Sequence, residues 1–141
     1  MRMNEHSSAA GPPVQLRSGE FHYFRVPRKD WSARLEDVRA AGLNAVSIYV
    51  PWNWHEPQRG RLDLTGETLP ERDLVGALDA IEAAGLDCVY RPGPFITAEW
   101  RGGGIPSWLW EELPEVQALD AEGRAAGAGR PYPAITYTHP A

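Results

Sequence analysis

The sequence has a single cysteine, no long apolar run and no excess of positive charge. One cysteine excludes an internal disulfide, and Cys88 is expected to be a small buried residue of a strand. Residues 1–13 contain no apolar run of signal-peptide length and no later stretch approaches a membrane span, so a cytoplasmic location is the default expectation. A formal net charge of −5 over 141 residues predicts no binding to nucleic acid or to an anionic membrane.

Several common catalytic signatures are also missing. The four histidines show neither HxH nor HExxH spacing, so no metal or other cofactor is expected. No GxSxG motif is present, and no arrangement of serine, histidine and aspartate suggests a hydrolytic triad. The turn at residues 25–29 contains no glycine, and the glycines at 102–104 are followed by Ile-Pro. Neither segment therefore predicts the phosphate loop of a nucleotide-binding domain.

The sequence is rich instead in tryptophan, proline and glycine, with six, 13 and 14 residues respectively. The prolines and glycines lie mostly between short apolar runs, which is typical of strands joined by elaborate loops. Apolar patterns predict strands over 19–26, 44–50 and 86–90, helices over 31–41 and 70–84, a short helix over 107–113 and a weak helical option over 114–126. Asp30 is expected to cap the first helix, whereas a capping box of Thr68 and Glu71 competes with Asp73 at the second.

An internal repeat indicates the architecture. Residues 40–46 (AAGLNAV) match residues 83–89 (AAGLDCV), and in both places a helix is expected to end at glycine with a strand following at once. Alternating strands and helices predict a parallel sheet of the α/β class. Short turns before the strands and long loops after them favour a (β/α)8 barrel, whose active site is built from those long loops. A doubly wound sheet shares the same element order and is the alternative.

Two of these long loops carry a candidate pair of carboxylates, Glu56 and Glu99. Glycosidases use two carboxyl groups, one as acid and one as base or nucleophile, so the residues alone suggest pairing them. The competing interpretation is that each glutamate binds a backbone amide or a nearby arginine. Tryptophan, asparagine and histidine surround Glu56, and such loops suit a sugar ligand, although most of the tryptophans are expected to be packing residues.

Four segments resemble a known family, glycoside hydrolase family 35, the β-galactosidases. They are SGEFHYFR at 18–25, YVPWNWHEP at 49–57, RPGPFITAEW at 91–100 and GGIPSWL at 103–109. The resemblance implies a partial TIM (β/α)8 barrel that holds the first three of eight strands. It also implies retaining hydrolysis of terminal β-galactosyl residues, with a β-galactoside or related oligosaccharide as the partner molecule.

The resemblance also implies roles for individual residues. Tyr49 matches the tyrosine that contacts the galactosyl ring, and Ala98 and Glu99 match the pair that binds sugar hydroxyls, Ala98 through its backbone. Glu99 is then a binding residue and not a catalyst. The acid/base glutamate of the family follows an asparagine after the fourth strand, and the nucleophile comes from the seventh. The only Asn-Glu dipeptide here is Asn4-Glu5, so both catalytic residues are expected downstream of Ala141 and the chain is expected to be inactive alone.

These interpretations divide the chain into three parts: a disordered leader at 1–17, the first βα units of the barrel at 18–113, and an irregular tail at 114–141 that leads towards a fourth strand. Two other functions stay open on the sequence. One is a non-catalytic carbohydrate-binding remnant that uses Tyr49 and Glu99. The other is a self-contained small domain of flavodoxin-like type, whose weakness is the missing phosphate loop.

Overall fold

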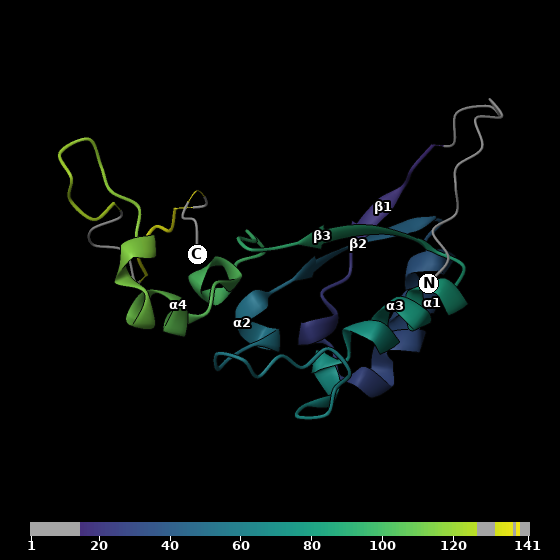
Figure 1. Ribbon diagram of the computed structural model, residues 1–141. Coiled ribbons are helices and arrows are strands. Elements are labelled where there is room, and N and C mark those ends of the chain that lie inside the picture. The colour runs from purple at the N-terminus through teal and green to yellow at the C-terminus, as the bar shows by residue number, and fades with distance from the viewer. Residues whose placement is uncertain (1–14, 127–131, 137, 139–141) are drawn as a thin grey trace, which may run out of the picture.

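A computed structural model describes residues 15–126, 132–136 and 138 of the chain (Figure 1). Three parallel strands form its sheet in the order β1 (Ser18–Glu20), β2 (Ala45–Val50) and β3 (Asp87–Pro92). Helix α1 (Trp31–Ala40) connects the first two strands and α3 (Leu74–Ala83) connects the next two. The two helices pack against each other beside the strands, which is the βαβαβ arrangement that the sequence predicts.

The core lies between β2 and the two helices. Val46 and Ile48 of β2 are fully buried, as are Leu35 of α1 and Ile81 of α3. The predicted apolar stripes therefore face the sheet. Two shorter helices, α2 (Trp52–His55) and α4 (Ser107–Glu112), lie in the loops that follow β2 and β3 (Figure 1). All of these loops begin at the same edge of the sheet, because the strands are parallel.

The first strand is shorter than the predicted span of 19–26. After Glu20 the backbone makes one more contact with β2, from Phe21 N to Ser47 O, and then turns into a 3₁₀ helix at Tyr23–Arg25. Tyr23 and Phe24 are buried in the core rather than placed on a strand. Their aromatic character reflected burial, which aromatic residues favour in any backbone conformation.

The helix caps differ from the predictions in an informative way. Asp30 stands at the start of α1 but its side chain caps no backbone amide. At α3 the competing cap is used, since Asp73 accepts a hydrogen bond from Gly76 N at 2.7 Å. The capping box does not form, because Thr68 donates its hydroxyl to Asp63 instead.

Cys88 is exposed, so the prediction of a buried cysteine is wrong. The reason is the position of β3, which pairs with β2 on one side and with no strand of the described residues on the other. Every residue of β3 is exposed, including Val89 and Tyr90 at 36% and 48%. An apolar run in the sequence marks this strand correctly but does not show which of its faces is covered.

The structure describes only parts of the two ends of the chain, the expected disordered leader at 1–17 and the expected irregular tail at 114–141. Residues 1–14 lie outside the described residues, but Gln15 and Arg17 of the expected leader are held by the side chain of Asn44. Among the described residues of the tail, Pro114–Val116 alone is helical, as a 3₁₀ turn. Antiparallel bridges then join Gln117 to Ile135 and Leu119 to Ala125. Across the residues that the structure describes, no helix is long and apolar enough to cross a membrane.

Candidate carbohydrate site

The three predicted sugar contacts lie at the edge of the sheet where the parallel strands end. Tyr49 is the last but one residue of β2, and Ala98 and Glu99 lie in the loop that follows β3. The Tyr49 hydroxyl lies 3.3 Å from Thr97 Oγ1, which joins the strand to that loop. The structure therefore brings all three residues into one neighbourhood, on the face where barrel enzymes carry their active sites.

The ring of Tyr49 is held from two sides. Arg91 stands opposite Tyr49 in the register of β2 and β3, and its guanidinium lies 4.1 Å from the centre of the ring. The ring of His22 lies 5.8 Å away on a tilted plane. Tyr49 is only 6% exposed, so these contacts fix the ring and leave its hydroxyl end as the part directed towards the loop.

Arg25 fixes the backbone at Ala98 and Glu99. Its guanidinium donates to the carbonyl oxygen of Ala98 at 2.6 Å and to that of Glu99 at 3.2 Å, and it also lies over the ring of Trp100 at 5.3 Å. Glu99 has a φ of 44°, a left-handed conformation that is uncommon for a residue other than glycine. Its carboxylate is exposed and binds none of the described side chains, so it is available to a ligand.

The other carboxylates at this edge are already engaged. Glu20 pairs with Arg91 at 3.4 Å and lies 3.1 Å from His22 Nε2. Glu56 accepts from Trp52 Nε1 at 2.6 Å and from Gly60 N at 2.7 Å, so both of its oxygens support its own loop. The pairing of Glu56 with Glu99 that the loop positions suggested is therefore not what the structure builds.

The loop after β2 is held by buried polar groups. Asp63 accepts hydrogen bonds from the amides of residues 65–68 and from the Thr68 hydroxyl, and is 6% exposed because its own loop covers it. Burial by itself raises the pKa of Asp63, but the bonds from Thr68, Thr65 and Glu67 outweigh that effect and hold the pKa well below its usual range. The carboxylate is thus charged at any ordinary pH.

His55 connects this loop to the core. It is 1% exposed, its Nδ1 lies 2.7 Å from the Asp63 carbonyl oxygen, and its Nε2 lies 2.6 Å from the Tyr23 hydroxyl. A carbonyl only accepts, so Nδ1 carries the hydrogen and Nε2 accepts from Tyr23. Burial lowers the pKa of His55, and burial likewise raises that of Tyr23. Both rings are therefore neutral at neutral pH, and their hydrogen bonds tie the loop to the core.

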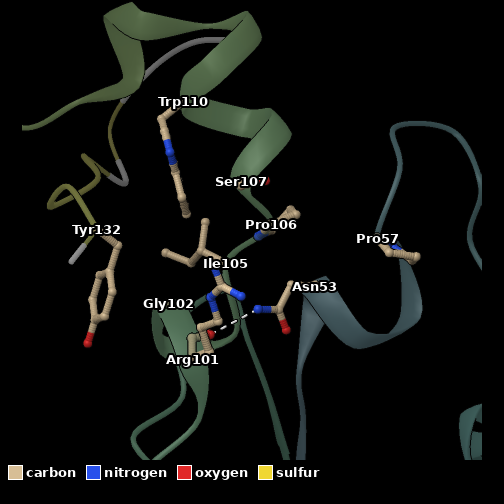
Figure 2. A pocket seen from close by; sticks show the side chains of 9 residues that line it. All are labelled: Asn53, Pro57, Arg101, Gly102, Ile105, Pro106, Ser107, Trp110 and Tyr132. Atoms are coloured by element: carbon tan, nitrogen blue, oxygen red, sulfur yellow. Dashed lines mark hydrogen bonds between the residues drawn. The ribbon is translucent and has the colours of Figure 1, made fainter.

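Five of the six tryptophans donate their ring N–H to protein atoms, which confirms that most of them are packing residues: Trp31, Trp52, Trp54, Trp100 and Trp108. Trp110 is the exception among the residues that the structure describes. It lines a cavity of about 450 Å³ together with Asn53 and Arg101, and Tyr49 and Glu99 do not line that cavity (Figure 2).

Sequence reasoning missed the residues that position these contacts. Arg25 acts across 73 residues of sequence, and Thr97 across 48. Both residues belong to the segments that resemble the family, but their spacing in the sequence did not indicate which residues they contact. As for metals, the described part of the chain contains no group of three or more histidine, cysteine, aspartate or glutamate side chains that could hold an ion.

Two comparisons with known proteins agree on the family. The model of glycosyl hydrolases family 35 matches residues 8–120. An exo-beta-D-glucosaminidase of Thermococcus kodakarensis is 48% identical over 92% of this chain, and a beta-galactosidase of Mus musculus is 46% identical over 72% of it. The chain spans 16% and 15% of the lengths of those two relatives, respectively.

The fold agrees as well. A crystal structure of a beta-galactosidase from the psychrophilic Marinomonas ef1 superimposes with a TM-score of 0.61 and 22% identity, over 82% of this chain and 15% of that one. The three parallel strands are thus the first strands of a partial barrel and not a flavodoxin-like sheet, as the long loops after the strands predicted. On these grounds the chain belongs to glycosyl hydrolases family 35.

Proposed function

We propose that this chain forms the sugar-binding side of a retaining glycosidase active site that acts on terminal β-galactosyl residues. Tyr49 and Glu99 contact hydroxyls of the terminal sugar, and Ala98 offers its backbone amide. The observation that carries the proposal is the exposed Glu99 carboxylate, which makes no hydrogen bond with the described residues and follows two residues after Thr97, whose hydroxyl contacts that of Tyr49. An exposed carboxylate on a loop that contacts the tyrosine hydroxyl supplies the few polar groups that orient a sugar.

The 141 residues on their own bind but do not hydrolyse. Retaining hydrolysis needs two carboxyl groups about 5–5.5 Å apart, one of them a nucleophile. At this edge of the described sheet Glu20 and Glu56 are both engaged, which leaves Glu99 as a single available carboxylate. The acid/base and the nucleophile of the reaction are therefore supplied from outside these residues.

Galactose titration of the chain tests the proposal. The expected result is saturable binding whose dissociation constant rises about tenfold in Glu99→Gln, because a charge-assisted hydrogen bond becomes a neutral one. The matched control is Glu36→Gln, an exposed glutamate of α1, which leaves the affinity unchanged. If Glu99→Gln and Glu36→Gln bound galactose with equal affinity, the proposal that Glu99 contacts the sugar would be wrong. If the chain released product from a chromogenic β-galactoside above a buffer blank, the proposal that the 141 residues do not hydrolyse on their own would be wrong.

A glucosaminyl substrate is the second candidate. It is favoured by the relative named exo-beta-D-glucosaminidase, whose match covers 92% of the chain against 72% for the mouse beta-galactosidase. The exposed Glu99 carboxylate suits an ammonium group as well as a hydroxyl. Parallel titrations with galactose and glucosamine decide between them. Tighter binding of glucosamine that is lost in Glu99→Gln would replace the galactosyl assignment.

A further inference from the structure

A cavity of about 450 Å³ lies between the loop after β2 and helix α4. Figure 2 shows Trp110 and Tyr132 along one side of it and Asn53 along the other, with Arg101 between them. This volume falls within the range of ligand pockets in proteins, about 300–1,000 Å³. Trp100 ties the cavity to the proposed site, since it follows Glu99 directly and donates to Asn53 Oδ1 at 2.7 Å.

The polar groups of the cavity are mostly donors. Asn53 is fixed, because its Nδ2 donates to the Arg101 carbonyl at 2.9 Å while its Oδ1 accepts from Trp100. Within the part of the chain that the structure describes, the Arg101 guanidinium forms no ion pair, and neither Trp110 Nε1 nor the Tyr132 hydroxyl makes a hydrogen bond. No described carboxylate lines the cavity. A ligand that pairs with the Arg101 guanidinium and with Trp110 Nε1 must therefore supply acceptors, whereas the hydroxyls of Ser107 and Tyr132 can donate or accept.

The cavity continues towards the β3 loop. A second cavity of about 250 Å³ shares Gly102, Ile105 and Tyr132 with the first and is bounded further along by Phe95. Phe95 is 47% exposed and stands two residues before Thr97, which holds Tyr49. Together the two cavities make one groove that runs from Trp110 to Phe95, with aromatic rings at intervals and donors at the Arg101 end.

We propose that this groove binds the saccharide units that follow the terminal sugar of an oligosaccharide, and that it accepts neutral or acidic units but disfavours protonated amino-sugar units. Aromatic rings pack against the apolar C–H face of a pyranose, and Arg101 donates to its oxygens. A protonated glucosamine unit would bring its ammonium group to the Arg101 guanidinium with no carboxylate to compensate. The inference rests on the proposed function, because it takes the terminal sugar to lie at Tyr49 and Glu99.

The test is a titration of the ¹⁵N-labelled chain, followed through the indole N–H signal of Trp110, which Trp110→Phe identifies. The probes are galactose, β-1,4-galactotriose and the glucosamine trimer in slightly acidic buffer. Galactotriose is expected to shift the Trp110 signal and to bind more tightly than galactose. Arg101→Gln is expected to weaken galactotriose about tenfold, the cost of one charge-assisted hydrogen bond. Arg39→Gln on α1, an exposed arginine at a distance from the groove, is the matched control and leaves the affinity unchanged.

The outcomes separate the groove from the terminal-sugar site. If Glu99→Gln weakens galactose while Arg101→Gln and Trp110→Phe bind galactotriose as the parent chain does, the groove assignment is overturned and the proposed function stands. If galactotriose shifts Trp110 but Glu99→Gln changes nothing, the groove stands and the proposed function fails. Binding of the glucosamine trimer as tightly as galactotriose would overturn the charge selection at Arg101.

Discussion

The loops after β2 and β3 leave the sheet at the same edge but use their polar groups in opposite ways. In the β2 loop Asp63, His55 and Glu56 direct their polar atoms inward and bind atoms of the loop or the core. In the β3 loop the Glu99 carboxylate faces solvent and Phe95 is 47% exposed. The loop after β2, residues 51–69, therefore acts as a brace that stabilises the fold, whereas the loop after β3, residues 93–106, leaves groups exposed and is the presenting loop of the proposed sugar site. Substitutions in the first loop should lower stability, and those in the second should lower affinity.

Asp63→Ala tests the brace and has the largest expected effect. Five hydrogen bonds converge on this carboxylate, and the amides of residues 65–68 would lose their acceptor. The free energy of unfolding is expected to fall by about 2–4 kcal/mol, measured by guanidinium titration with tryptophan fluorescence. Asp79→Ala, at an exposed position of α3, is the control and changes stability by less than about 0.5 kcal/mol. Equal midpoints for the two variants would contradict the brace.

The stability of the protein in mild acid is the second test of the brace, because it depends on the protonation of His55. Burial holds the pKa of this histidine below its ordinary value of 6.5, so the unfolded chain takes up a proton that the folded chain refuses. Stability is therefore expected to fall as the pH drops below that value and to go on falling until the folded pKa is reached. Asp63 does not contribute in this window, because its pKa is lowered from 3.8 and its contribution is lost only in stronger acid.

Two variants isolate this effect. His55→Gln is expected to flatten the dependence of the unfolding midpoint on pH below about pH 6.5, since the group that titrates is gone. Gln58→Ala, at an exposed position of the same loop that does not titrate, is the control and is expected to retain the dependence. An unchanged slope in His55→Gln would mean that other groups cause the acid sensitivity.

The sequence was sufficient for the elements that local patterns determine. Gly42 and Gly85 both adopt positive φ at the predicted helix ends, and the two strands that follow them begin within one residue of the expected position. These signals are local, because a glycine stop and an apolar run act within a few residues. The strand and helix order predicted a parallel sheet, and the long loops after the strands and the resemblance to the family favoured the partial barrel over a doubly wound sheet.

The brace could not be predicted from the sequence, because the hydrogen-bond partners of its side chains do not follow a periodic pattern. Asp63 is one of several acidic residues in a polar loop, and only the folded loop shows that residues 65–68 all turn their amides towards it. Arg25 is a similar case, since its contact with Ala98 spans 73 residues. The motifs that resemble the family contain Tyr49 and Glu99, which lie at the edge where the parallel strands end, but the residues that contact them there depended on the tertiary structure.

Thr97→Val tests the presenting loop and has the smallest expected effect on stability. Thr97 is exposed and its hydroxyl makes one contact, at 3.3 Å from the Tyr49 hydroxyl, so the free energy of unfolding should change by less than about 0.5 kcal/mol. The affinity for galactose should nevertheless fall about threefold, because the Tyr49 hydroxyl loses the contact that orients it. Thr65→Val is the matched control in the β2 loop, where an exposed threonine makes one weak side-chain contact with Glu67. It should leave galactose affinity unchanged. If both threonine variants lowered the affinity for galactose equally, the role of the loop after β3 in sugar binding would be wrong. If Thr97→Val lowered the free energy of unfolding as much as Asp63→Ala, the separate role of the loop after β2 in stability would be wrong.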